Sequence, residues 1–192
     1  MSDQVTDVSD VDRLVEEISM LRGKVAQLQE RVDQLDQLAH QDSLIDLPNR
    51  RGFMRALERL IDRVQRYGEC GAMLFVDLDG LKLINDSFGH QAGDQALIQV
   101  ARLLSGGVRK SDIVARLGGD EFGILLVHAD ETNAHETAAR LVDLIAGCDF
   151  THGGDALPLS VAIGVGMIEG DDTPDMVMAR ADEAMYRRKV AA

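Results

Sequence analysis

The stretch RLGGDEFGILL (residues 116–126) places two glycines and two adjacent acids directly before an apolar run. The runs DIVARL (112–117) and EFGILLVH (121–128) have the composition of strands, so the glycine pair predicts a hairpin with a two-residue turn. Adjacent carboxylates repel each other and are costly to bury. Asp120 and Glu121 therefore predict that a positively charged partner lies at this hairpin.

A second acidic pair, Asp77 and Asp79, ends the predicted strand LFVDLDG (residues 74–80). Together with the hairpin acids it offers the oxygen ligands that Mg²⁺ prefers alongside substrate phosphates. Two such ions can clamp the attacking and leaving oxygens in phosphoryl or nucleotidyl transfer. The backbone at Gly118 and Gly119, which lacks Cβ atoms, can approach a phosphate closely. The spacing alone is equally compatible with ordinary turn acids at strand ends.

Hydrophobic periodicity and turn residues predict the remaining elements of the C-terminal part. With the hairpin, the order is α-β-α-β-β-α-β-α, which predicts one α+β domain with helices packed on a mostly antiparallel sheet. These further elements are helices over residues 53–67, 93–104, 132–147 and 173–189, and strands over residues 71–78 and 157–168.

The N-terminal part carries a heptad repeat over about four heptads, which is typical of a coiled coil. β-Branched residues predominate at a and Leu occupies d, a choice that favours a parallel two-stranded homodimer. The alternative is a helix packed on its own domain. The a positions are Val11, Ile18, Val25, Val32 and Ala39, and the d positions are Leu14, Leu21, Leu28 and Leu35.

The predicted organisation is a disordered acidic N-terminus (residues 1–10), a coiled-coil dimerisation helix (11–41) and a globular domain (42–192). The net charge of −13 argues against nucleic-acid partners and anionic membrane surfaces. No apolar run approaches the ~20 residues of a membrane span, so we expect no membrane insertion. Cys70 and Cys148 form no CxxC motif, which fits a cytoplasmic protein.

Four motifs follow one another over about residues 40–189, namely DSLIDLPNRRGF (42–53), DLDGLKLINDSFGHQAGD (77–94), GGDEF (118–122) and ARADEAMYRRK (179–189). Together they resemble the GGDEF-family diguanylate cyclases. The resemblance implies a ferredoxin-like, polymerase-palm-type GGDEF domain. It also implies that two GTP molecules are condensed into cyclic di-GMP and two pyrophosphates where two domains face each other.

The same resemblance implies the site residues. Asp77, the carbonyl of Leu78 and Asp120 would hold two Mg²⁺ ions per active site, with Mn²⁺ as the alternative metal. Asp120 would accept the proton of the attacking 3′-hydroxyl, with Glu121 close by. Taken singly, these residues fit structural roles better: His90 a packing role in a loop, Asp94 a helix N-cap and Lys189 a helix C-terminus. The implied GTP-binding residues are Asn85, His90, Asp94, Lys82, Gly118, Gly119 and Lys189.

The stretch RKSD (residues 109–112) fits the family's RxxD motif at the expected distance before GGDEF. The resemblance implies that Arg109 and Asp112 bind cyclic di-GMP as an inhibiting product, with Arg140 as a further contact from a partner domain. An Arg fork suits guanine or phosphate acceptors. The alternative is a basic turn followed by an acid that starts a strand.

Two other functions stay open beside the enzyme. The first is a catalytically weak or inactive GGDEF protein that acts as a cyclic di-GMP receptor. The given residues end at Ala192, before the position of an Arg-containing tail that contacts phosphate in the family, and this favours the receptor. The second is a coiled-coil dimeriser whose globular half only binds partners. The acids Asp77, Asp120 and Glu121 are intact, which favours the enzyme.

Overall fold

The structure is a computed structural model that describes the backbone of residues 4–191, and their side chains apart from those of residues 4–10, 33–35, 37–38 and 191. The chain divides into two compact units, with the boundary in the sequence between Ala39 and His40. This boundary lies within three residues of the one that the composition predicts. Each unit is described by itself.

The first unit is formed by helix α1 (Gln4–His40). Residues 4–10 are helical where the sequence predicts a disordered segment, and residues 1–3 of that segment lie outside the described residues. The large apolar side chains at the described heptad positions are 48% to 65% exposed, namely Val11, Leu14, Ile18, Leu21, Val25, Leu28 and Val32.

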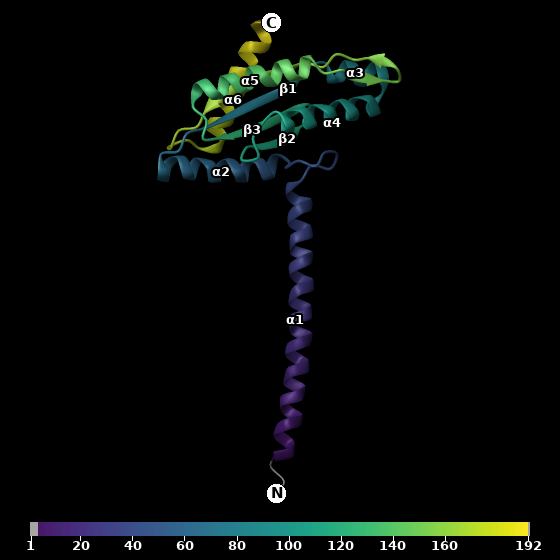
Figure 1. The fold of residues 1–192 in the computed structure, drawn as a ribbon, viewed down its shortest axis with the longest axis vertical. Helices are drawn as coiled ribbons and strands as arrows, with labels where there is room; N and C mark the ends of the chain where they lie inside the picture. Colours follow the sequence, from purple (N-terminus) through teal and green to yellow (C-terminus); the bar gives the residue numbers. More distant parts are fainter. Residues whose placement is uncertain (1–3, 192) are drawn as a thin grey trace. The chain divides into compact units, whose positions relative to one another are not determined.

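The second unit is built on a four-stranded sheet with the order β2-β3-β1-β6 (Figure 1). Its strands are β1 (Gly71–Leu78), β2 (Ile113–Gly118), β3 (Glu121–Val127) and β6 (Val161–Met167). All three pairings are antiparallel, which confirms the predicted sheet. Strand β1 lies inside the sheet and is buried along almost its whole length. The C-terminal end of β1 therefore holds its side chains in fixed positions.

Five helices belong to this unit, and one of them was missed in the sequence because it is only eight residues long. That helix, α3, buries Leu81 and Ile84 and is bounded by Gly80 and Gly89. A short hairpin of β4 (Thr151–His152) and β5 (Asp155–Ala156) was also missed. The helices are α2 (Arg50–Tyr67), α3 (Leu81–Phe88), α4 (His90–Gly106), α5 (Glu131–Ala146) and α6 (Pro174–Ala191).

The two faces of the sheet are packed into two separate hydrophobic clusters. Alternate residues of β1 point to opposite faces, as the two-residue period of a strand requires. Leu74 and Val76 join the cluster with α3, α4 and α5, whereas Met73 and Phe75 join the cluster with α2 and α6. The sheet is thus covered by helices on both sides.

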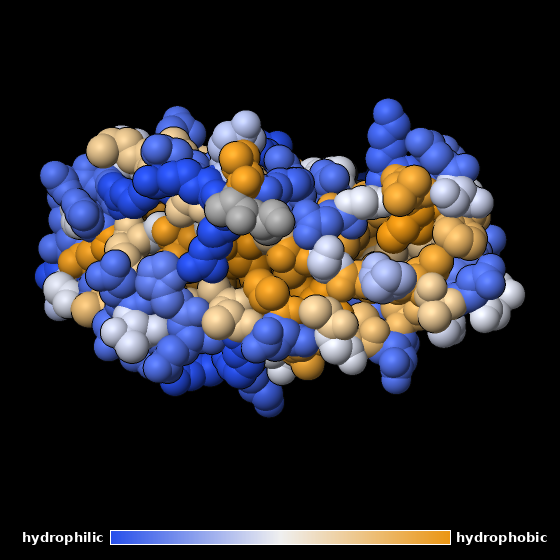
Figure 2. Space-filling model, turned by 90° about the horizontal axis from the view of Figure 1, so that it is seen from above, coloured by the Kyte–Doolittle hydropathy of each residue, from blue (hydrophilic) through white to orange (hydrophobic). Residues whose placement is uncertain are grey.

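Close backbone packing brings α6 against the sheet. A Cβ atom on Gly164 of β6 would lie 2.1 Å from the backbone of both Ala181 and Met185, so only glycine fits there. The surface of the molecule carries both apolar and hydrophilic residues. Figure 2 shows one face, on which an apolar band lies between hydrophilic margins. The approach of α6 matters for function because its last turns carry Lys189.

Candidate active site

The acids that the sequence singled out lie at one end of the two central strands. Asp77 of β1 is the register partner of Glu121 of β3. The backbone N–H of Leu78 donates to the carbonyl of Asp120 at 3.0 Å, which ties the hairpin turn to the end of β1. Asp77, Leu78, Asp120 and Glu121 are therefore brought together, as predicted.

The turn itself differs from the predicted Gly118–Gly119 loop. Gly118 pairs with Glu121 and still belongs to β2, so the two loop residues are Gly119 and Asp120. The cause is a register shift between Arg116 and Gly118, which no strand pattern in the sequence signals. Gly119 has φ +51° and Gly118 has φ +151°, both in the range that favours glycine. Asp120 thus stands in the loop itself.

Lys189 of α6 contacts the acids at the end of β1, whereas the sequence predicted a positive partner at the hairpin acids Asp120 and Glu121. Its Nζ contacts Asp77 Oδ1 and lies 3.8 Å from Asp79 Oδ1. The hydrogen bond to Asp77 raises the pKa of Lys189, and the nearby charges of Asp77, Asp79 and Asp120 add to the rise against the effect of desolvation. Ser160 Oγ donates to Asp79 Oδ2 at 2.9 Å and fixes that carboxylate.

Glu121 lies among an excess of negative charge. Partial burial raises its pKa, and the charges of Asp120, Asp77 and Asp182 raise it further, while Arg50 opposes them. Neither Arg50 nor Asp182 was singled out in the sequence, since they come from α2 and α6, far from the motif along the chain. Even with Lys189 in place, this end of the sheet is short of positive charge.

The donor chemistry of this cluster fits a divalent cation. The carboxylates of Asp77 and Asp120 and the carbonyl of Leu78 are hard oxygen donors. Within the described part of the chain, no three His, Cys, Asp or Glu side chains gather as a protein-only metal site. These donors would suit an ion that completes its shell with water and substrate phosphates, as Mg²⁺ does.

Four of the implied GTP-binding residues, Lys82, Asn85, His90 and Asp94, lie on α3 and α4, directly after β1. A Cβ atom on Gly93 would lie 2.0 Å from Asn85 Oδ1, so α4 passes immediately beside the Asn85 side chain. His90 and Asp94 are exposed and stand four residues apart on α4, which places them on one helix face. Lys82 is exposed on α3.

Arg109, Asp112 and Arg140 line a single pocket of about 310 Å³ within one chain. Asp112 Oδ2 accepts from the backbone N–H of Arg109 at 2.9 Å, and its Oδ1 accepts from Val127 N–H at 3.1 Å. Arg140 Nη1 donates to the carbonyl of Gly107. The sequence predicted that Arg140 would reach this site from a partner domain. In the structure, Arg140 of the same chain lines the pocket. His128, Asn133 and Thr137, also missed, complete the polar lining.

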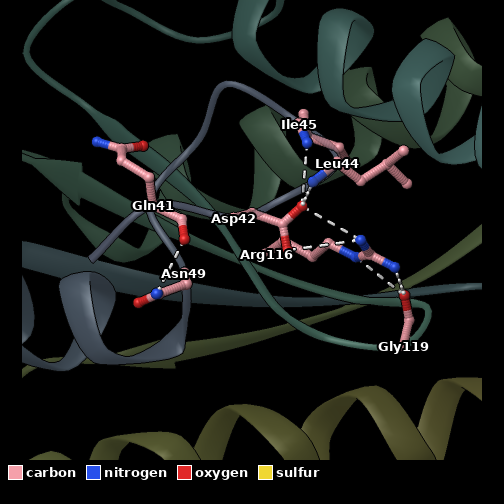
Figure 3. A network of polar contacts seen from close by, with 7 residues as sticks. All are labelled: Gln41, Asp42, Leu44, Ile45, Asn49, Arg116 and Gly119. Carbon is pink, nitrogen blue, oxygen red and sulfur yellow. Dashed lines mark hydrogen bonds and ion pairs between the residues drawn. The ribbon is translucent and has the colours of Figure 1, made fainter. Parts of the chain in front are cut away.

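A polar network around Arg116 was also missed (Figure 3). Arg116 donates to the carbonyl of Gly119 from Nε at 3.1 Å and from Nη2 at 2.8 Å. Its Nη1 lies 3.2 Å from Asp42 Oδ1. In the sequence, Asp42 belongs to the motif DSLIDLPNRRGF and Arg116 to the stretch RLGGDEFGILL, and nothing there linked the two.

Comparison with known families decides the affiliation of the chain. The family model described as the diguanylate cyclase GGDEF domain matches residues 39–192. The chain belongs to the GGDEF family. Over 188 residues it is 36% identical to the diguanylate cyclase TpbB of Pseudomonas aeruginosa, covering 95% of this chain and 43% of TpbB. This GGDEF protein thus spans less than half the length of that curated relative.

Solved structures agree on the fold of this GGDEF protein. The coiled coil and GGDEF domain of DgcB from Caulobacter crescentus, in complex with c-di-GMP, matches with a TM-score of 0.85 at 24% identity, covering 93% of this chain and 95% of that chain. The GGDEF domain of DgcB in complex with c-di-GMP matches with a TM-score of 0.76 at 26% identity, covering 80% of this chain and 89% of that chain. Among the described residues of the GGDEF protein, no helix is long and apolar enough to cross a membrane.

The raised pKa of Glu121 predicts a pH-dependent stability effect. An acid whose pKa is raised by folding binds more protons in the folded state, so its ionisation lowers stability as the pH rises above the ordinary range of a glutamic acid. In metal-free buffer we expect Glu121→Gln to raise Tm at pH 7 by about 1–2 °C, a small shift because the side chain is partly exposed. The gain should vanish below about pH 4, where both proteins are neutral at this position.

Differential scanning calorimetry from pH 3.5 to pH 8 measures this effect. Glu136→Gln, which removes an exposed acid of α5, is the matched control and should show no such trend. A Glu121→Gln protein that is less stable than the wild type at pH 7 would contradict the assignment.

Proposed function

We propose that this GGDEF protein is a diguanylate cyclase that condenses two GTP molecules into cyclic di-GMP and releases two pyrophosphates, each domain holding one GTP. The observation that carries the proposal is the group formed by Asp77, Asp120 and Glu121 at the end of β1 and β3, with Lys189 beside it. A hard-cation site next to a glycine turn suits nucleotidyl transfer.

The residues divide the reaction between them. Asp77, the Leu78 carbonyl and Asp120 would hold Mg²⁺, two ions per site with Mn²⁺ as a substitute, and the metal would supply charge neutralisation at the phosphates. Asp120 accepts the proton of the attacking 3′-hydroxyl, and Glu121 keeps this region negative. Lys189 and Lys82 bind the triphosphate. The support for these roles is the position of Lys189, which lies within reach of Asp77 and Asp79.

Guanine recognition is assigned to Asn85, His90 and Asp94. A carboxylate such as that of Asp94 accepts from both N1–H and the N2 amine of guanine, a donor pair that adenine lacks. Support comes from the exposure of His90 and Asp94 on one face of α4 and from the contact of Asn85 with α4. The backbone of Gly118 and Gly119 leaves room for phosphates on the other side of the nucleotide.

A time course with GTP and Mg²⁺ tests the activity. We expect the protein to produce cyclic di-GMP and pyrophosphate, and Asp120→Asn to lower the rate by at least about 10³-fold, because the variant loses the proton acceptor and a metal ligand together. Asp86→Asn, which changes an exposed acid on α3, is the control. No product from the wild type, with tight cyclic di-GMP binding in the same preparation, would establish the receptor function instead.

Pairing of two domains is assigned to α1. Its described heptad side chains are about half exposed in the single chain, and a parallel coil would bury them and raise the effective concentration of the domains. We therefore propose a homodimer through α1, with catalysis across the two facing domains.

Charges placed in the heptad seam should separate the dimer. We expect Leu21→Glu with Leu28→Glu to give a monomer by sedimentation equilibrium and a specific activity at least about tenfold lower, because the effective concentration is lost. Ser19→Glu with Ala26→Glu adds the same charges at b positions and should leave both quantities unchanged. A dimer that survives the seam variant would place the pairing surface elsewhere.

Product inhibition is assigned to the pocket of Arg109, Asp112 and Arg140. The volume of this pocket, its two guanidinium groups and the half-buried carboxylate of Asp112 suit a guanine nucleotide. The complex of c-di-GMP with the related GGDEF domain of DgcB supports a product-binding role for the family fold.

Removal of the Arg109 side chain should relieve inhibition selectively. We expect Arg109→Ala to raise the half-inhibitory concentration of added cyclic di-GMP by at least about tenfold, since charge-assisted hydrogen bonds are lost, and to change the initial rate by less than about twofold. Lys110→Ala, which removes a neighbouring cation outside the pocket, is the control. Unchanged inhibition in Arg109→Ala would exclude this pocket as the inhibitory site.

A further inference from the structure

The Arg116 side chain holds one of the two peptide units next to Asp120. Two of its nitrogens, Nε and Nη2, donate to the Gly119 carbonyl at 3.1 and 2.8 Å. That carbonyl belongs to the Gly119–Asp120 peptide, whose plane is therefore oriented by a rigid guanidinium fork. Gly119 by itself would restrict this plane little, because glycine, which has no Cβ atom, has a wide range of allowed φ and ψ angles.

The second peptide unit next to Asp120 is fixed as well. Its carbonyl accepts from the backbone N–H of Leu78 at 3.0 Å, at the end of β1. With both flanking peptide planes held, the backbone dihedrals of Asp120 are set, and so is the direction of its Cα–Cβ bond. Groups that do not contact the carboxylate of Asp120 thus set the direction in which its side chain leaves the backbone.

Asp42 in turn fixes the guanidinium. Its Oδ1 and Oδ2 lie 3.2 and 3.5 Å from Arg116 Nη1, and Oδ1 also accepts from the backbone N–H groups of Leu44 and Ile45 at 2.9 and 3.0 Å (Figure 3). The two side chains of this pair are only 15% and 16% exposed, so water competes weakly for them. Backbone contacts hold the same segments together, since Arg116 N–H donates to the Pro48 carbonyl at 2.9 Å.

We propose that Arg116 and Asp42 are positioning residues of the cyclase reaction. They act through the Gly119 carbonyl and set the geometry of Asp120, a role that rests on the proposed function. Neither residue touches the reacting atoms. Loss of either should therefore lower kcat much more than it changes the KM for GTP, because binding groups elsewhere in the site stay in place.

Steady-state kinetics and amide hydrogen exchange on the full chain test this role. For Arg116→Lys and for Asp42→Asn we expect kcat to fall by about 10–100-fold with a KM change below about threefold, as misplacement by about 1 Å would give. The kcat of the double variant should be little lower than that of either single variant, since both substitutions disrupt the same Asp42–Arg116–Gly119 interaction. Exchange in residues 118–121 should become at least about tenfold faster in each variant.

Arg63→Lys is the matched control, because it weakens another Arg–carboxylate pair, Arg63 with Glu69 at 2.7 Å, away from the turn. It should change neither kcat nor exchange at residues 118–121. Cyclic di-GMP binding at the Arg109 pocket should be equal in all variants. This result would separate a misplaced Asp120 side chain from an unfolded domain.

The outcomes separate the two proposals. Unchanged kcat and unchanged exchange in Arg116→Lys and Asp42→Asn would overturn the positioning role while leaving the cyclase proposal intact. Equal losses in kcat and in cyclic di-GMP binding would overturn it in favour of a general structural role. A wild type without cyclase activity would overturn the proposed function and the catalytic part of this role. The exchange measurement would then still support or overturn the ordering of the turn.

Discussion

Negative charge gathered at one end of the central strands is the constraint on which the rest of this domain depends. Asp77 and Glu121 are register partners on adjacent strands, and Asp120 is joined to Leu78 through the backbone. The carboxylates of such a group repel one another, so they stay together only where the surrounding fold supplies rigidity and positive charge. The sheet supplies the rigidity through a β1 strand that is packed on both faces, and α6 supplies charge through Lys189.

The rigidity has a specific origin in side-chain size. Phe75 of β1 faces glycine on both neighbouring strands, Gly123 on β3 and Gly164 on β6. Gly123 leaves room for the ring of Phe53 from α2, and Gly164 leaves room for the backbone of α6. Helix α6 therefore lies close to the sheet at Gly164, whereas at Gly123 the Phe53 side chain fills the space. Positions far from the acids along the chain thereby determine how near α6 comes to them.

Local signals in the sequence predicted much of this arrangement. The antiparallel sheet, the long helices and the acids at the strand ends follow from periodicity and turn residues, and the GGDEF affiliation from four quoted motifs. Helix α3 was missed because eight residues give little periodicity, and the loop was placed one residue early because a register shift leaves no pattern. The pair of Asp42 and Arg116 spans 74 residues, and the shared pocket of Arg109 and Arg140 joins a loop to α5. Contacts of that kind depend on tertiary packing, which single-sequence patterns do not encode.

The order in which the chain is made gives the contact of Lys189 with Asp77 a further consequence. These residues are 112 positions apart, and α6 is the last element of the domain to leave the ribosome. Synthesis runs from the N-terminus, so the segments of β1 and β3 are both available before that of α6. A nascent chain can therefore pair β1 with β3 while its acids still lack their lysine. The acids at this strand end therefore gain Lys189 only after the segment of α6 has been made, so a chain that has not yet reached α6 exposes them without that cation.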